Sequence, residues 1–365
     1  MAALCLYGKE RKTMKRYISI LSLAAVVAVI QLGSTLCGRE YYLTQLTMAA
    51  YYSLVAVGLC MLMGYAGQIS LGHAAFFAIG GYTTAVLTTM NLQAHTSSRI
   101  VSLLVQCGLA KPGTDLYGVA QLSLSPWIAL GGAGIITVVI AIIIGIPVLK
   151  LKGHYLAMAT LGFGIIVYRI TLGTGLFGQA DGISGVPQFT IVPGIAIGGG
   201  FANKVINYYI AWVMVICGML LLLNLIDSRV GRALKSIHGS EEAASAIGIH
   251  IPRYKLMVFI ISALFASLAG VCLTHYNGGI GPSEAGVMKS VRYVAIVAVG
   301  GMANLWGTLI MSVLLNYLSL RGYFGSYDDA VFGAILIGIM LFAPDGIIKT
   351  IRTKVEARVK VKVRE

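Results

Sequence analysis

The side chains that could do chemistry in this largely apolar chain gather in residues 64–82, GYAGQISLGHAAFFAIGGY. Gln68, Ser70 and His73 place an amide, a hydroxyl and an imidazole in a stretch apolar enough to lie in a bilayer. Each polar group left unsatisfied in lipid costs several kcal/mol, so these side chains must face protein or a water-filled path. They could form hydrogen bonds with a passing solute, or equally well tie a broken backbone to neighbouring helices.

The sequence carries none of the motifs that mark nucleotide hydrolysis or hydrolytic catalysis. The phosphate-binding loop GxxxxGK[ST] is missing, and so are HExxH and GxSxG. The histidines and cysteines are scattered without the spacing of metal ligands. We therefore expect no metal site, no cofactor bound by this chain and no enzymatic activity of its own.

The composition indicates which elements must position these polar residues. Hydrophobic residues make up 58% of the chain and charged residues 11%, and the mean hydropathy is +0.85. Apolar runs near the length of a membrane span, without strand alternation, predict helices rather than barrel strands. We predict an all-α fold, a polytopic transmembrane helical bundle of about 8–10 membrane segments that include broken or half-helices.

The predicted spans follow one another along the chain with short connections. A basic stretch precedes the first apolar run, but no convincing cleavage site follows it, which predicts a retained helix rather than a signal peptide. Residues 91–126 are predicted to form an external loop. The long spans are expected at residues 17–36, 41–63, 127–149, 154–175, 205–226 and 256–276, and shorter apolar pieces at 289–301, 305–320 and 328–344.

The formal net charge of +14 is concentrated just outside the apolar segments, at residues 9–16, 229–235 and 349–364. This pattern is typical of positive-inside loops and of contact with anionic membrane lipids, and no nucleic-acid recognition motif accompanies it. We predict three parts: a cytoplasmic basic N-terminus at 1–16, a transmembrane domain at 17–348 and a cytoplasmic basic tail at 349–365. Both termini on one side require an even number of crossings.

Two glycine-rich interruptions divide the apolar segments. GYAGQISLG at 64–72 and GGMANLWGT at 300–308 have a loosely similar texture, which hints at an internal repeat. Short, glycine-interrupted segments in a membrane protein are typical of a solute path. The candidate path-lining residues are Gln68, Ser70, His73, Gly300 and Asn304.

The longest polar loop between spans covers residues 227–255 and has the signals of a short helix. Ser240 is a favourable N-cap, Glu241 and Glu242 complement the positive end of a helix, and Gly248 can close it. Pro252 then starts the next membrane element. Small side chains flanked by charges are typical of a docking surface, although a charged loop that only obeys membrane topology would look similar.

One acidic residue outside the spans could serve a partner. Glu284 follows Pro282 in an external loop and could contact a delivering protein, with an ordinary solvated acid as the favoured interpretation. Arg292, near the end of a span, is expected to extend its charge toward water.

The loop sequence GRALKSIHGSEEAASAIGI, followed by PRYKLMVFIISALFASLAG, resembles the EAA-type loop of ABC importer membrane subunits. In particular it is similar to the LivM-type permeases of the branched-chain amino acid ABC transporter family. Stretches at 64–83, 146–164, 300–310 and 341–347 agree with that family, so the resemblance spans about residues 40–348. The chain departs from it at His154, Ile165 and His238, where the family often has acidic or other charged residues.

This resemblance implies a multi-pass permease of a bacterial inner membrane that moves branched-chain or other hydrophobic amino acids inward. It implies a homologous LivH-type permease, two ATP-binding subunits of the LivG/LivF type that use the ATP, and a periplasmic substrate-binding protein as partners. By the same resemblance, the ATPase-coupling residues are Ser240, Glu241, Glu242, Ala243, Ala244, Ala246 and Gly248.

Two alternatives remain open at this point. Permeases of the same family for urea or short amides would look much alike. An ion-coupled secondary transporter would work alone, but the spans lack the paired intramembrane carboxylates expected of one.

Overall fold

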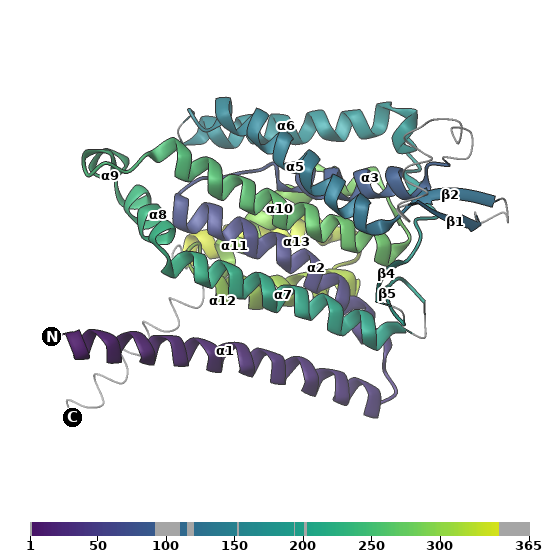
Figure 1. The fold of residues 1–365 in the computed structure, drawn as a ribbon, viewed down its shortest axis with the longest axis horizontal. Coiled ribbons are helices and arrows are strands. Elements are labelled where there is room, and N and C mark those ends of the chain that lie inside the picture. Colours follow the sequence, from purple (N-terminus) through teal and green to yellow (C-terminus); the bar gives the residue numbers. More distant parts are fainter. Residues whose placement is uncertain are drawn as a thin grey trace.

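The computed structural model describes residues 2–91, 110–114, 120–151, 153–192, 194–200 and 203–342. Within these residues the chain is a helical bundle elongated along one axis (Figure 1). The basic tail predicted at 349–365, and most of the stretch 341–347, lie outside the described residues. The side chains of the basic N-terminus at 1–16 also lie outside them.

Six described helices are long and apolar enough to cross a membrane. They are α1 (Ala2–Leu36), α2 (Tyr41–Cys60) with its π-helical extension (Met61–Tyr65), α5 (Pro126–Val148), α6 (His154–Gly173), α7 (Lys204–Asp227) and α10 (Ile251–Asn277). Four shorter apolar helices are α3 (His73–Thr89), α11 (Val287–Gly300), α12 (Leu305–Leu320) and α13 (Asp328–Phe342). The predicted polytopic helical bundle is confirmed.

Strands are few and short in the described part of the chain. β1 (Ala110–Thr114) and β2 (Ala120–Leu124) form an antiparallel hairpin inside the stretch predicted as an external loop. β3 (Ile183–Ser184) pairs with β6 (Gly279–Ile280), and β4 (Phe189–Val192) with β5 (Ile195–Ile197). The labelled strands β1, β2, β4 and β5 lie at one end of the bundle, hereafter the strand end (Figure 1).

The opposite end, hereafter the α9 end, carries two helices that belong to no span. These are α8 (Arg229–Gly239) and α9 (Glu241–Ala246), and the start of α1 lies at the same end (Figure 1). The prediction for residues 227–255 contained only the second of these helices. α8 was missed because its apolar positions are few and lie among basic residues, although Ser228 is an N-cap signal whose Oγ accepts from the Val230 and Gly231 amides.

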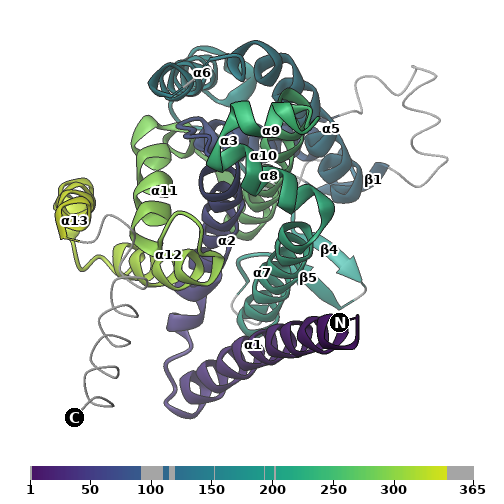
Figure 2. The same ribbon diagram turned by 90° about the vertical axis from the view of Figure 1, so that its left-hand side faces the viewer.

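Helix α2 lies at the centre of the bundle, with α7, α10, α11 and α12 around it (Figure 2). α3 crosses α10 so closely that a Cβ on Gly270 would overlap the carbonyl oxygen of Phe77. A Cβ on Gly80 would overlap the backbone of Ser267 in the same way. Small residues at such crossings are typical of membrane helices, since close backbones maximise packing where water supplies no hydrophobic driving force.

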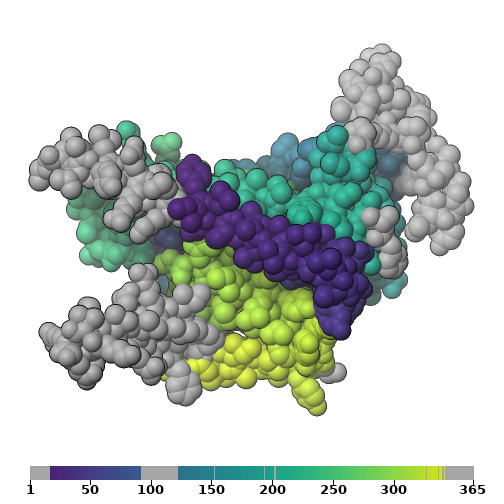
Figure 3. All heavy atoms as spheres, turned by 90° about the horizontal axis from the view of Figure 1, so that it is seen from below, coloured from purple at the N-terminus to yellow at the C-terminus, as the bar shows by residue number. Residues whose placement is uncertain are grey.

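Helix α1 lies along one face of the bundle and is largely exposed there (Figure 3). Its ties to the bundle run to α7: Tyr208 donates to the Val27 carbonyl at 3.2 Å, and Tyr209 donates to Gln31 Oε1 at 3.1 Å. Large apolar side chains such as Leu21 face outward. This face of the chain is therefore suited to lipid or to another membrane subunit.

The α3–α10 crossing leads to a stability prediction. We expect Gly270→Ala to destabilise the protein by about 1–3 kcal/mol, because the added methyl group meets backbone rather than a movable side chain. The measurement is thermal unfolding of the purified protein in detergent. Gly162→Ala in α6 is the matched control, because nothing lies within 4 Å of its added Cβ. Equal unfolding temperatures for the two variants would contradict the close crossing.

Candidate functional site

The predicted break between the second and third apolar segments is present. The α2 backbone ends in the π-helix, and residues 67–72 are not helical before α3 begins at His73. Neighbouring elements satisfy the freed amides: Gln68 N donates to the Leu62 carbonyl at 3.2 Å, and Leu71 N to Thr160 Oγ1 at 3.0 Å. Non-helical backbone at membrane depth is tolerated only with such partners. We call residues 64–72, from the last residues of the π-helix to the residue before α3, the first break.

His73 is fully buried and fastens the first break to α10. Its Nδ1 lies 3.1 Å from Ser70 Oγ, and its Nε2 lies 2.7 Å from Ser262 Oγ. The rings of Phe76 and Phe259 pack edge-on around the imidazole. Ser70 and His73 thus lie in contact, and these polar atoms bind protein groups in this arrangement; the role of both residues in lining a path stays a prediction.

Gln68 differs from its two polar neighbours. It is 1% exposed, and neither atom of its side-chain amide has a hydrogen-bond partner among the described residues. A buried amide without partners is rare and costly. Gly67 and Ile69 instead form the exposed side of the first break. Sequence reasoning did not single out Ile69, since an isoleucine in an apolar stretch carries no signal of exposure.

The second predicted interruption is the turn between α11 and α12, and we call residues 301–304 the second break. Asn304 caps α12, where its Oδ1 accepts from Gly307 N at 3.2 Å. Gly300 is buried at the end of α11, and a Cβ there would lie 2.5 Å from the Thr308 Cα. Gly300 and Asn304 therefore hold the turn, and their role in lining a path stays a prediction.

The two breaks, more than 200 residues apart in sequence, are in direct contact. A Cβ on Gly64 would overlap the carbonyl group of Met302. Cys60 Sγ lies 3.4 Å from the same carbonyl oxygen, and the Tyr65 hydroxyl donates to the Ala303 carbonyl at 2.9 Å. The two interruptions therefore form one structural unit near the α9 end, hereafter the paired break.

Helix α9 forms as the capping signals predict. Ser240 Oγ accepts from Ala243 N at 3.3 Å, and Gly248 ends the turn with a φ of +83°. Glu241 is not free, because it forms an ion pair of 2.6 Å with Lys255 of α10. Ala244 is 1% exposed and so packs inward.

The outward face of α9 differs from the predicted coupling set. Glu242, Ala243 and Ala246 are exposed, and Ile247, which the prediction omitted, is 72% exposed. Figure 2 shows α9 on the face of the bundle turned toward the viewer. An isoleucine directly after a short capped helix is a signal that could have identified this position. An apolar side chain presented on a polar tip is typical of the centre of a docking surface.

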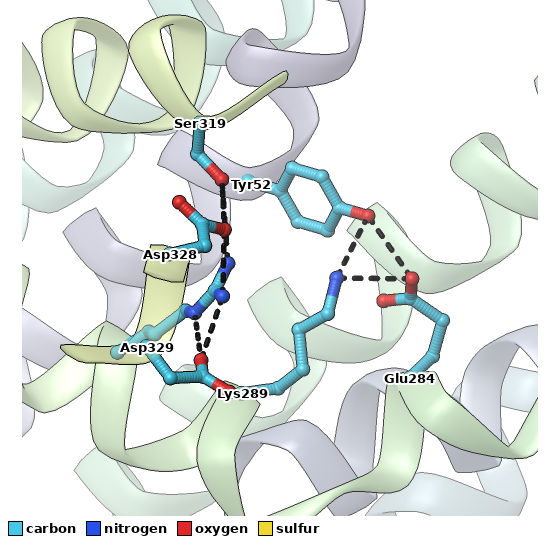
Figure 4. Close-up of polar contacts among 7 residues, drawn as sticks. Tyr52, Glu284, Lys289, Ser319, Asp328 and Asp329 are labelled. Carbon is cyan, nitrogen blue, oxygen red and sulfur yellow. Dashed lines mark hydrogen bonds and ion pairs between the residues drawn. The ribbon is translucent and has the colours of Figure 1, made fainter. Parts of the chain in front are cut away.

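A second polar cluster connects α2, α11, α12 and α13 (Figure 4). Lys289 Nζ lies 3.1 Å from Glu284 Oε1, and the Tyr52 hydroxyl donates to the same oxygen at 3.1 Å. The Glu284 side chain is 19% exposed, so its interpretation as an ordinary solvated acid is wrong. The cluster joins α2 to the start of α11.

The cluster continues through Arg292, which was expected only to reach toward water. Its guanidinium lies 2.7 Å from carboxylate oxygens of both Asp328 and Asp329, at the start of α13. Ser319 Oγ donates to Asp328 Oδ2 at 2.6 Å (Figure 4). These ion pairs hold α13 against α11 and α12. No group of three or more metal-ligating side chains occurs in the described ranges.

Comparison with known proteins agrees with this architecture. The family model described as "Branched-chain amino acid transport system / permease component" matches residues 41–340. The LivM permease proteins of high-affinity branched-chain amino acid transport systems in Salmonella typhimurium and Escherichia coli are each 28% identical, over 86% of this chain and 71% of theirs. The corresponding LivH protein of Salmonella typhimurium is 25% identical over 84% of this chain and 96% of its own. No solved structure matches the chain.

The Lys289–Glu284 pair leads to a prediction about stability. Lys289→Met should destabilise the protein by about 1–3 kcal/mol, because a largely buried carboxylate loses its counter-charge. Adding Glu284→Gln should recover most of the loss, since the amide oxygen can still accept from Tyr52. Unfolding in detergent measures both variants, with Lys150→Met on the exposed surface as control. A double variant as unstable as Lys289→Met would show that the pair is not coupled.

Proposed function

Because the chain belongs to the family of permease components of branched-chain amino acid transport systems, we propose that it forms one half of the membrane passage of an ABC importer. The other half is a homologous permease of the LivH type. The likeness of this chain to both LivM and LivH proteins supports such a pair of related subunits. Two ATP-binding subunits supply the energy, and a periplasmic binding protein delivers the cargo.

The orientation follows from charge. Arg229, Arg232 and Lys235 lie on α8 at the α9 end, and the start of α1 lies at the same end. By the positive-inside rule, the α9 end faces the cytoplasm and the strand end faces the periplasm. The N-terminus is then cytoplasmic, and the binding protein meets the strand end.

The observation that carries the proposal is the outward face of α9. A capped helix at the tip of the cytoplasmic end presents small side chains and one exposed aliphatic residue, Ile247, to a partner. Small side chains permit close approach, and Glu242 adds a charge that fixes orientation. We assign this face as the seat of an ATP-binding subunit, and ATP is bound there rather than by this chain.

Movement of α9 reaches the membrane through α10. The Glu241–Lys255 ion pair joins α9 to the first turns of α10, and Lys255 is largely buried. α10 in turn crosses α3 with backbones in contact at Gly270 and Gly80. Hydrolysis in the partners would thus move packed helices against the sister permease and expose the passage to one side at a time.

Reconstitution tests the proposal as a whole. Purified complex of this chain, a LivH-type permease, the ATP-binding subunits and the binding protein is placed in proteoliposomes. We expect leucine uptake that requires ATP and the binding protein. ATP-driven uptake of urea but not of leucine would show that the proposed cargo is wrong. Gradient-driven uptake by this chain alone would show that it is a secondary transporter rather than an ABC importer subunit.

The docking face of α9 gives a sharper prediction. Ile247→Asp should weaken the binding of the ATP-binding subunits at least about 10-fold, because a carboxylate would be buried in an apolar contact. Ile247→Leu is the matched control and should bind as the unchanged protein does. Co-purification of the ATP-binding subunits and leucine uptake measure both variants. If Ile247→Asp assembled and transported normally, α9 would not be the docking site.

A further inference from the structure

Helix α8 touches the first break directly. Gly67 has a φ of +67°, a conformation that glycine adopts at little cost, and an added Cβ would lie 2.7 Å from Nδ1 of His238. His238 belongs to the last turn of α8, immediately before the α9 cap at Ser240. The loop that receives the partner therefore abuts the backbone at the point where the membrane helix is interrupted.

A second contact lies one turn earlier on the same helix. Lys235 Nζ is 5.8 Å from the centre of the Tyr65 ring, within reach of a cation–π interaction. The hydroxyl of Tyr65 donates to the Ala303 carbonyl in the second break. A continuous set of contacts thus leads from α8 through the first break into the second.

The two sides of this contact differ in how firmly they are held. α8 is anchored by Leu234 and Ile237, whose side chains are 0% and 2% exposed, and Ser240 N donates to the Ser236 carbonyl, which joins α8 to α9. Residues 67–72 of the first break belong to no helix, and the Gln68 side-chain amide is buried without a hydrogen-bond partner among the described residues. A displacement of α9 would pass to α8 through this connection, and from α8 to the first break through the contacts of His238 and Lys235.

We infer that α8 is a lever that shifts the paired break, and that the paired break is the cytoplasmic gate of the passage. His238 and Lys235 are the positioning residues. His238 presses against Gly67, and Lys235 holds the Tyr65 ring, whose hydroxyl is bound to the second break. Shifting the first break would also expose the Gln68 amide to water. This exposure would remove the desolvation penalty that the amide carries while it is buried without a hydrogen-bond partner. The inference rests on the proposed function, since the force enters at α9.

The test uses the complete reconstituted transporter and two measurements. The first is leucine taken up per ATP hydrolysed. The second is the hydrogen exchange of backbone amides in residues 66–72, with and without a non-hydrolysable ATP analogue. The variant is the double substitution His238→Ala and Lys235→Met, and the control is His250→Ala, an exposed histidine of the same loop.

In the unchanged transporter and the control, we expect the analogue to alter exchange in the first break. In the double variant that response should disappear, and uptake per ATP should fall about 10-fold, within the range of couplings carried by a few contacts. Retained binding of the ATP-binding subunits separates this loss from failed assembly.

Three outcomes would overturn the inference. One is a double variant whose uptake per ATP and exchange response match the unchanged transporter. Another is an unchanged transporter that takes up leucine although the ATP analogue does not alter hydrogen exchange in residues 66–72. The third is an unchanged complex that shows no ATP-driven uptake. This result would contradict the proposed function, and the inference about α8 would fall with it.

Discussion

The structure depends on one constraint: a chain interrupted inside a membrane must find hydrogen-bond partners for its backbone within the protein. The first break meets this constraint with side chains from two other helices, Thr160 of α6 and Ser290 of α11, whose hydroxyls accept from Leu71 N and Ala74 N. His73 adds Ser262 of α10 to the set. The positions of α6, α10 and α11 around α3 are therefore coupled to the conformation of the break.

The same constraint explains why the two interruptions lie together. Each one frees backbone groups, and the Met302 and Ala303 carbonyls of the second break receive Cys60 and Tyr65 from the element that ends at the first. Glycine at position 64 permits this approach, since any side chain there would displace the second break. A displacement of one break must therefore displace the other, and a gate formed from two segments requires this coupling.

The ion pairs between helices have two different tasks. The Lys289–Glu284 pair and the pairs of Arg292 hold α11 to α2 and α13. At the α9 end, the Glu241–Lys255 pair joins the docking helix to α10. Ion pairs between helices fix geometry as well as energy, whereas the two breaks contact each other through hydrogen bonds and close backbone packing.

The sequence alone determined what depends on neighbours in the chain: the apolar spans, the broken segment, and the Ser240 cap with Gly248 at the end of α9. Their signals are local, because span length, helix capping and backbone freedom are set within a few residues. Only the tertiary structure decided that Ser262, 189 positions away, is the partner of His73 and that Glu284 is paired. It also decided that Ala244 faces inward while Ile247 faces out. Such pairings follow from how helices pack, and no local pattern encodes them.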